Sequence, residues 1–298
     1  MGSLRNPAGW CNIYGFRPSW GRVPSGPDGE TFFHTLATDG PMARCPADLA
    51  ALLDTMAGPV PGRPFGLPHE PLAGRLGAEM AGRRVAWLGD WGGAFPCAPG
   101  VLETCTAALD EMTGLGIDVA VPAPPMDAEA MWQSWVTLRH WAVQARLGVF
   151  FDAPAKRSHL KPAALWEIEQ GRALSRTEIE RAGAIRSDWY RRADALFDRY
   201  DALILPTAQL WPFPVETVHP TEINGAAMDS YHRWMQVVVP ASLIGLPSVA
   251  VPAGFGANGL PMGLQIIGRH GDDLGVLQLA EAWHRATDWP NRRPPEEA

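Results

Sequence analysis

The sequence predicts an α/β protein, a mixed twisted sheet covered by helices on both faces, and three observations support this class. Segments with the apolar spacing of helices alternate with short apolar runs typical of strands. Two such runs lie in the stretch 234–268, which has no charged side chain. Hydrophobic residues make up 46% of the 298 residues and charged residues 19%, a balance that can bury a sizeable core. No repeat and no linker divides the chain, so we expect one domain.

The first half of the chain predicts a helix, a loop and a βαβ unit, in that order. Residues 46–58 have a proline in the first turn, apolar side chains spaced i, i+3, i+4 and i+7, and a closing glycine, as in a helix. Residues 59–71 are rich in Pro and Gly and predict a loop. Strands are predicted at 85–88 and 117–121, on either side of a helix over 101–112.

The second half predicts two more helices and three buried strands. One face of the first helix carries Trp132, Trp135, Leu138, Trp141 and Ala145. This stripe indicates core packing rather than a ligand cage. Thr177 is expected to cap a longer helix that ends near Tyr200 and is followed by a strand at 202–205. The apolar runs 248–251 and 263–267 predict strands that are covered on both faces.

Neither a membrane span nor a secretory signal is expected. The stretch 234–268 is long enough to cross a bilayer, but each of its four prolines would remove a helix hydrogen bond that lipid cannot replace. Arg5 lies near the start of the chain, but no apolar segment follows it. We therefore predict a cytoplasmic protein.

Charge and cysteine usage exclude further classes of function. The chain has 25 Lys plus Arg against 32 Asp plus Glu, a net charge of -7, so no basic surface for nucleic acid is expected. Its four cysteines are too few for a disulfide scaffold, and none forms a CxxC pair. The eight histidines show no metal-binding spacing, so no metal site is predicted.

Three familiar motifs can be tested and set aside. Gly254, Gly256 and Gly259 have the spacing GxGxxG after a strand, but another strand follows instead of the helix that a dinucleotide site needs. Asn258-Gly259 instead predicts a hairpin turn. The chain lacks the Gly-Lys of a P-loop and the GxSxG of an α/β-hydrolase. Asp272 and Asp273 are interpreted as acidic residues at a helix start.

Three blocks of sequence resemble one enzyme family. Residues 2–8 read Gly-Ser-Leu-Arg-Asn-Pro-Ala, and residues 39–44 read Asp-Gly-Pro-Met-Ala-Arg. The second block, 200–207, is Tyr-Asp-Ala-Leu-Ile-Leu-Pro-Thr, and the third runs from Gly-Leu-Pro at 245–247 to Gly-Leu-Gln-Ile-Ile-Gly at 263–268. In this order the blocks resemble the amidase signature family. The resemblance covers 2–58 and 200–268 and is looser between them. It implies that residues 1–298 are the C-terminal portion of a single amidase-signature domain that lacks its N-terminal part.

The resemblance also implies a catalytic mechanism. In this family a Ser-Ser-Lys triad uses a neutral lysine, acting through a second serine, to activate a nucleophilic serine, which Ser3 matches. The nucleophile attacks an amide carbonyl and forms an acyl-enzyme that water hydrolyses. Gly2 matches a glycine whose backbone N–H belongs to the oxyanion hole. The mechanism needs no metal and no cofactor.

The lysine and the relay serine of the family both lie before the nucleophile, where this chain offers no matching residues. The two lysines of the chain, Lys156 and Lys161, fall in the loosely matched middle. We interpret them as solvated residues in a loop or at a helix end. Ser3 without a base is a weak nucleophile. The chain alone is therefore expected to be inactive as an amidase.

Three residues are candidates for substrate binding. Trp211 and Phe213 follow the strand at 202–205 in a Pro- and Trp-rich loop and could contact an apolar acyl group. Packing within the fold is the alternative for both. Arg5 follows Ser3 closely and could meet a substrate carboxylate, with a structural ion pair as the alternative.

The predicted function is hydrolysis of a small-molecule carboxylic amide to an acid plus ammonia or an amine. One alternative is the amidase subunit of a tRNA-dependent amidotransferase, and another is a non-catalytic remnant that acts as an interaction module. A missing N-terminal part would leave apolar surfaces uncovered, and the uncharged run 237–251 is rich in β-branched residues. We therefore expect the chain to be aggregated, oligomeric or dependent on a second polypeptide.

Overall fold

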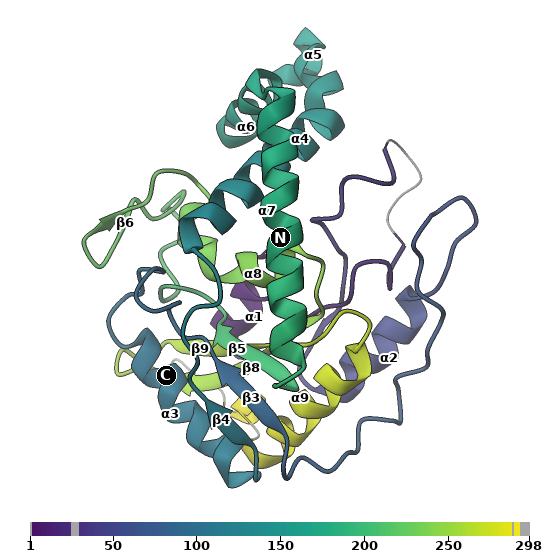
Figure 1. Cartoon of the computed structure of the whole chain (residues 1–298). Helices are drawn as coiled ribbons and strands as arrows, with labels where there is room; N and C mark the ends of the chain where they lie inside the picture. Colours follow the sequence, from purple (N-terminus) through teal and green to yellow (C-terminus); the bar gives the residue numbers. More distant parts are fainter. Residues whose placement is uncertain (1, 25–29, 288, 293–298) are drawn as a thin grey trace.

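A mixed sheet of seven strands lies at the centre of the computed structural model, which describes residues 2–24, 30–287 and 289–292 (Figure 1). In spatial order its strands are β2 (Met42–Ala43), β1 (Tyr14–Arg17), β8 (Ser248–Phe255), β9 (Pro261–Ile267), β5 (Ala202–Pro206), β3 (Arg84–Trp87) and β4 (Asp118–Ala120). β5, β3 and β4 pair in parallel, and the other neighbours pair antiparallel. A separate hairpin joins β6 (Glu222–Ile223) to β7 (Ala226–Ala227).

Helices cover both faces of this sheet, as the sequence predicts. The α-helices are α1 (Asn6–Trp10), α2 (Pro46–Met56), α3 (Val101–Gly114), α4 (Ala128–Phe151), α5 (Pro154–Arg157), α6 (Pro162–Ala173), α7 (Arg176–Phe197), α8 (Val239–Leu243) and α9 (Asp273–Thr287). Two 3-10 helices are η1 (Arg233–Val238) and η2 (Trp289–Asn291). The fold class is therefore the predicted one.

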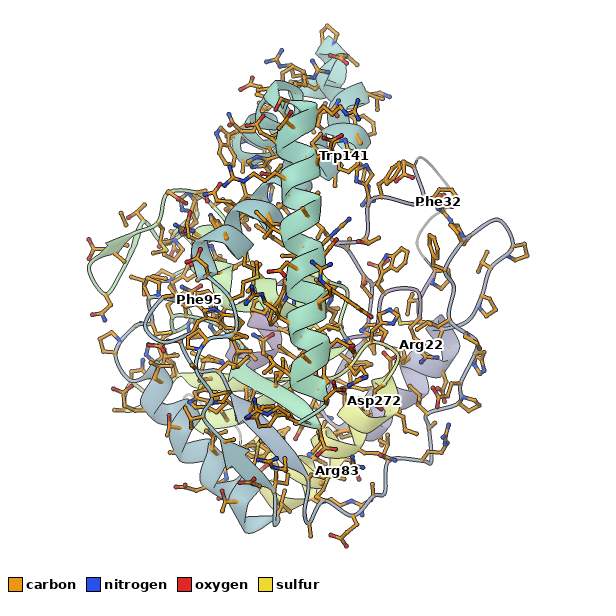
Figure 2. All side chains as sticks on the ribbon, in the orientation of Figure 1. Arg22, Phe32, Arg83, Phe95, Trp141 and Asp272 are labelled. Carbon is orange, nitrogen blue, oxygen red and sulfur yellow. The ribbon has the colours of Figure 1, made fainter. Side chains whose placement is uncertain are left out.

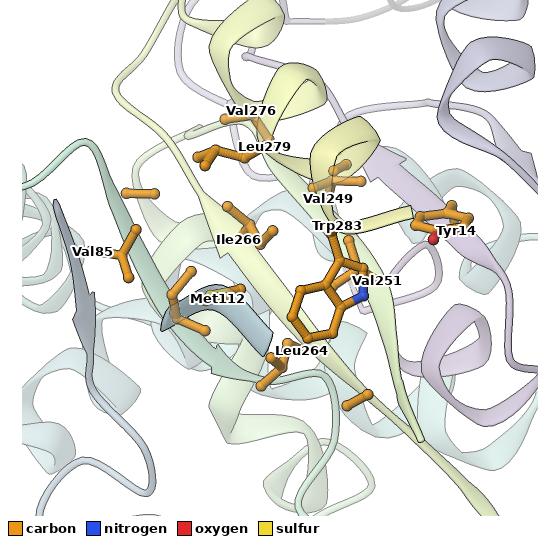
Figure 3. Packing of buried hydrophobic residues seen from close by; sticks show 14 of the residues in the cluster. Tyr14, Val85, Met112, Val249, Val251, Leu264, Ile266, Val276, Leu279 and Trp283 are labelled. Carbon is orange, nitrogen blue, oxygen red and sulfur yellow. The ribbon is translucent and has the colours of Figure 1, made fainter. Parts of the chain in front are cut away.

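Two hydrophobic clusters fill the two sides of the sheet. On one side, buried side chains of α2, α3 and α9 pack on alternate residues of the central strands. Figure 3 shows Trp283 and Leu279 of α9 lying over Leu264 and Ile266 of β9. On the other side, side chains of α4, α7 and α8 form the second cluster, which includes Trp132 and Trp189. The alternation along each strand explains why both faces of β5, β8 and β9 are apolar.

α4 extends beyond the sheet, and this explains where the tryptophan stripe ends. Figure 1 shows α4, α5 and α6 projecting from the body of the molecule, with α7 running from this group back to the sheet. Trp132, Trp135 and Leu138 are buried, as predicted for core residues. Trp141 is half-buried beside His34, at 4.6 Å between ring centroids, and Ala145 is exposed. The stripe leaves the core where the helix leaves the sheet.

The predicted elements of the chain occur in the structure, with one wrong cap. The helix at 46–58, the βαβ unit and the strand at 202–205 correspond to α2, β3-α3-β4 and β5 within a few residues. Thr177 does not cap α7. Ser175 does, because its hydroxyl accepts the N–H of Glu178 while the Glu178 carboxylate accepts the N–H of Ser175. This capping box satisfies two backbone donors at once and is preferred over a single cap.

The uncharged stretch contains a β-hairpin. β8 pairs with β9 in antiparallel register, and the chain turns between them through Gly259, whose φ is 75°. The GxGxxG spacing therefore belongs to a turn, as predicted. β8 continues to Phe255, four residues beyond the prediction, because the pair resumes after an irregularity between Pro252 and Gly254. A bulge accommodates the missing N–H of a proline in a strand.

The run 237–251 is not the exposed surface that the sequence suggested. Its valines belong to η1, α8 and β8 and are buried, and Val249 and Val251 pack in the same cluster as side chains of α9. This expectation was wrong because β-branched side chains of a central strand find partners on both faces of the sheet. No helix within the described ranges is both long and apolar enough to cross a bilayer. The cytoplasmic location stays a prediction.

Candidate active site

Ser3 lies in an exposed turn directly before α1. The carbonyl oxygen of Gly2 closes this turn by accepting the N–H groups of Arg5 at 2.9 Å and Asn6 at 3.0 Å. A side chain on residue 2 would collide with the carboxamide of Asn6, so the turn requires glycine there. The geometry leaves the Ser3 hydroxyl at the surface while the backbone on either side of it is held by the fold.

Residues from all three sequence blocks hold α1 in place. The Asn6 side chain donates from Nδ2 to the carbonyl oxygen of Thr207 at 2.7 Å. The Thr207 N–H in turn donates to the carbonyl oxygen of Gly263 at 2.8 Å. A Cβ on Gly9 would meet the Thr207 hydroxyl and lie 3.2 Å from the Gly263 nitrogen, so α1 touches β9 through glycines. Ser3 is thus positioned by residues about 200 and 260 positions away.

Arg5 is fully buried below α1. Its Nη1 donates to the carbonyl oxygen of Val238 and to Oε1 of Gln265, both at 3.0 Å, and its Nη2 donates to the Ser242 hydroxyl at 2.6 Å. Burial, and secondarily the charge of Arg17, lowers the pKa of Arg5 well below its usual value. These contacts tie α1 to η1, α8 and β9. Substrate binding by Arg5 stays a prediction.

The two aromatic candidates lie in different surroundings. Phe213 packs edge-on against Trp10 of α1 and Trp234 of η1, at 5.3 Å and 5.6 Å between ring centroids, and Trp10 stacks on Trp234 at 5.3 Å. Trp211 instead donates from Nε1 to the carbonyl oxygen of Pro99 at 2.9 Å and packs near Gly256. Both side chains are half-buried.

We call Trp10, Phe213 and Trp234 the aromatic cluster. It is close to the turn that contains Ser3, because a Cβ on Gly2 would lie 3.3 Å from Sδ of Met235, the neighbour of Trp234. Phe213 is identified from the sequence, whereas the two tryptophans are missed. The spacing of Asn6 and Trp10, four residues apart on one helix face, could have indicated Trp10. Trp234 has no comparable sequence pattern.

Neither lysine of the chain lies near Ser3. Lys156 is in the last turn of α5 and Lys161 precedes α6, and both are exposed. Figure 1 places α5 at the outer end of the projecting group, far from α1. Their interpretation as solvated residues at helix ends is confirmed.

A second group of buried titratable side chains lies between α4, α6 and η1. Nε2 of His232 is 3.1 Å from Oε1 of Glu167, and Nε of Arg139 is 2.8 Å from Oε2 of the same carboxylate. Burial lowers the pKa of His232 and, more strongly, that of His140, to about 4. In Glu167 the hydrogen bond from His232 and the charge of Arg139 outweigh burial and lower the carboxyl pKa. This group links α4, α6 and η1.

The acidic pair lies at the start of α9, as predicted, with Asp273 in the first turn and Asp272 Oδ1 accepting the N–H of Gly275 at 3.0 Å, and Asp273 has a further role. Asp273 is fully buried, where it accepts the N–H of Ser19 at 2.7 Å and pairs with Arg22 at 3.0 Å. Figure 2 shows Arg22 and the neighbouring Asp272 on the side of the molecule that carries α2 and α9. Asp273 therefore also forms a buried ion pair, and its contacts join the segment of Ser19 and Arg22 to α9. Across the residues that the structure describes, His, Cys, Asp and Glu form no group of three that could hold a metal ion.

Comparisons with known proteins show which family the chain resembles. The model of the family described as Amidase matches residues 1–277. An acylamidase of Rhodococcus erythropolis is 29% identical over 302 residues, covering 98% of this chain and 61% of its own length. A glutamyl-tRNA(Gln) amidotransferase subunit of Ralstonia nicotianae is 32% identical, covering 98% of this chain and 65% of its own length.

Solved structures show the same similarity. A bacterial aryl acylamidase of the amidase signature family superposes with a TM-score of 0.85 and 27% identity, over 98% of this chain and 63% of its own. A 6-aminohexanoate cyclic dimer hydrolase, 24% identical, shares the fold with a TM-score of 0.83. This chain therefore spans less than two thirds of the length of these relatives. The family match over residues 1–277 shows that the chain belongs to the amidase signature family.

Proposed function

We propose that this chain carries the nucleophile of an amidase that hydrolyses a small carboxylic amide to an acid plus ammonia or an amine. The observation that supports this most is the position of Ser3, exposed on a turn that all three family blocks hold in place. A nucleophile needs both access for the substrate and a fixed direction of attack. The turn before α1 offers both.

The proposed reaction has two halves. The Ser3 Oγ forms a bond to the amide carbonyl carbon, and its proton passes to a base. The C–N bond then breaks, the nitrogen leaves with a proton, and an ester to Ser3 remains. Water cleaves this ester and restores the hydroxyl. The backbone N–H groups of Gly2 and Ser3 would stabilise the negative charge on the carbonyl oxygen.

We infer that the base comes from a segment outside this sequence, and the remote positions of both lysines from Ser3 support this. More than a third of the length of the relatives has no counterpart in this chain, which spans 61% and 65% of them. We infer that a polypeptide corresponding to that remaining part completes the site and supplies the Ser and Lys of the triad. We call it the complementing polypeptide, whether it is joined to this chain or separate.

An apolar acyl group fits the surroundings of the nucleophile best. Trp10 belongs to α1, and its Nε1 donates to the carbonyl oxygen of Leu210 at 2.9 Å, which joins α1 to the segment that carries Phe213. Phe213 is therefore the candidate that the geometry favours, with Trp10 and Trp234 beside it. The contacts of Arg5 and Trp211 within the fold make them weaker candidates for substrate binding.

Release of ammonia from glutamine within an amidotransferase is a second candidate. It is favoured by the 32% identity to the Ralstonia nicotianae protein over 98% of this chain. An aryl amide and glutamine differ in the side chain that the acyl pocket must accept, so their relative rates separate the two functions.

The test is an assay of this chain alone and of the chain joined to the part of the Rhodococcus erythropolis acylamidase outside the matched region. Alone, the chain should release no ammonia from acetamide, benzamide or glutamine, because Ser3 lacks a base. The joined protein should be active, and Ser3→Ala should lower kcat by about a thousandfold or more. Ser158→Ala, at an exposed serine in the projecting group, is the matched control and should leave kcat unchanged.

Three outcomes would contradict the proposal. Near-full activity of the joined protein with Ser3→Ala would show that Ser3 is not the nucleophile. Ammonia release by the chain alone that Ser3→Ala removes, but Lys156→Ala and Lys161→Ala do not, would reveal a base outside both lysines. Absence of turnover in the joined, folded protein would support the remnant alternative.

A further inference from the structure

An open groove of about 560 Å³ lies between α7 and the loops that precede and follow α2. Arg186 and Tyr190 of α7 line one wall, Trp20 and Phe65 line the other, and Ile244 contributes to the floor. We call this the aromatic groove. It lies apart from the aromatic cluster beside Ser3 and shares no residue with it.

The groove exposes large aromatic side chains. Phe65 is 59% exposed and Tyr190 is 46% exposed. Phe32 is 57% exposed and packs edge-on against Phe65, with 5.9 Å between ring centroids. The ring centroid of Trp20 lies 5.7 Å from that of Phe65. Figure 2 shows Phe32 on the loops beside α7. Adjoining exposed aromatic rings are typical of an interaction surface.

The backbone of Phe65 is strained in a way that displays its ring. Its φ is 61°, in the left-handed region that costs a bulky residue roughly 1–2 kcal/mol. Gly21, at φ 95°, lets this loop approach closely, because a Cβ there would collide with the Phe65 carbonyl oxygen. The Leu67 N–H donates to the Gly21 carbonyl oxygen at 2.8 Å and fixes the approach. The fold therefore maintains an unfavourable conformation that holds an aromatic ring at the surface.

Arg186 gives the groove a positive charge. Its Nη1 donates to the Thr35 hydroxyl at 3.3 Å, and no acidic side chain in the described ranges forms an ion pair with it. Burial lowers the pKa of Arg186, which reflects the cost of removing its charge from water. A carboxylate that entered the groove would compensate this charge.

The geometry points to the aromatic groove as the docking site of the complementing polypeptide, which would place apolar side chains against Phe65 and Tyr190 and a carboxylate against Arg186. This inference rests on the proposed function, because it presumes that such a polypeptide completes the domain. The relatives supply the argument for the occupant: 35% to 39% of their length has no counterpart in this chain, since it spans 65% and 61% of them. A small ligand would fill the groove but would leave the adjoining Phe32 ring exposed.

The experiment measures binding of the complementing polypeptide, made as the separate, fluorophore-labelled part of the Rhodococcus erythropolis acylamidase outside the match. Fluorescence anisotropy gives its Kd for this chain. Tyr190→Ala and Arg186→Met should each weaken binding about tenfold or more, as for residues at the centre of an interface. Phe65→Asn should do the same, because asparagine tolerates the left-handed backbone and removes only the ring.

Control variants separate this inference from the proposed function. Val121→Ser, at an exposed valine after β4, should change Kd less than twofold. Ser3→Ala should bind like the wild type while losing turnover. At saturating polypeptide the three groove variants should regain wild-type kcat, because they affect docking and not the reaction. Arg186→Met should also reduce the salt dependence of Kd.

Three results would overturn the inference. The first is a Kd that the groove variants leave unchanged, since docking would then use another surface. The second is no association with the wild-type chain, even when the polypeptide is joined to it and the effective concentration is raised to millimolar. The third is benzoate binding in the groove that persists with the polypeptide bound, which would make the groove a small-molecule site. Circular dichroism of each variant checks that it is folded.

Discussion

At the scale of single residues, the site depends on contacts that span almost the whole chain. Asn6 reaches the strand end at Thr207, and Arg5 reaches Gln265, 260 residues away. Both are polar side chains that are buried and hydrogen-bonded, and they fix the backbone two and three residues after the exposed Ser3.

Replacing Asn6 tests this arrangement. Asn6→Ala should lower the free energy of unfolding by about 1–3 kcal/mol, because the Thr207 carbonyl oxygen loses a buried donor. Asn6→Asp keeps the shape of the side chain but turns an acceptor toward another acceptor, so it should cost at least as much. Urea denaturation measures both. An Asn6→Asp protein as stable as the wild type would show that the hydrogen bond does not anchor α1.

At the scale of elements, the sequence patterns that predict helices and strands depend only on residues close together in the chain. They place α2 and α3 correctly because one face of each helix packs on the sheet and gives a helical period, and they place β3 and β5 because short apolar runs indicate buried strands. They place the start of α7 wrongly at Thr177 because two nearby polar residues, Ser175 and Thr177, can both act as caps. The Glu178 carboxylate decides between them.

The pH dependence of stability should reflect the packing of α4 against α6. His140 is buried edge-on to Trp166 of α6, at 4.9 Å between ring centroids, and its pKa is lowered to about 4. In the unfolded chain a histidine titrates near 6.5, so the unfolded state binds more protons between pH 6.5 and 4. The stability that depends on a neutral, buried His140 is therefore fully present above pH 6.5, and it is lost as the pH falls toward 4.

Urea denaturation at pH 7.5, 6 and 5 measures this contribution, which is at most about 3 kcal/mol. His140→Phe keeps an aromatic ring beside Trp166 and removes the titration, so its stability should decline less between pH 6.5 and 5. A residual decline is expected from His232, whose pKa burial also lowers. The control His159→Phe, at an exposed position, should match the wild-type slope. Equal slopes for His140→Phe and the wild type would contradict the assignment.

At the scale of the whole molecule, both faces of the sheet are covered, yet the surface still carries apolar groups. The run 237–251 is buried, whereas the aromatic groove and the neighbouring Phe32 are exposed. We therefore expect any association to use the loops around α2 and α7 rather than the central strands. Which apolar side chains are exposed depends on how the helices and loops cover the sheet, and not on the hydrophobicity of any one segment.

The isolated chain should therefore self-associate or depend on a second polypeptide. Light scattering should give a mass above the 32.3 kDa of one chain, rising with protein concentration. Phe65→Asn combined with Tyr190→Ala should shift the mass toward that of one chain, and Val121→Ser should not. A monodisperse monomer with one cooperative thermal transition would contradict this expectation and would favour the remnant alternative.

The family, the fold class and the identity of the nucleophile candidate follow from the sequence, because short motifs and the periods of helices and strands are local properties. The βαβ unit and the β8–β9 hairpin belong to this class. Other features depend on residues that meet only after folding: the aromatic cluster joins positions 10, 213 and 234, and the aromatic groove joins positions 20, 65 and 190. Local patterns do not encode which distant side chains become neighbours, since this is decided when helices and loops pack on a shared sheet.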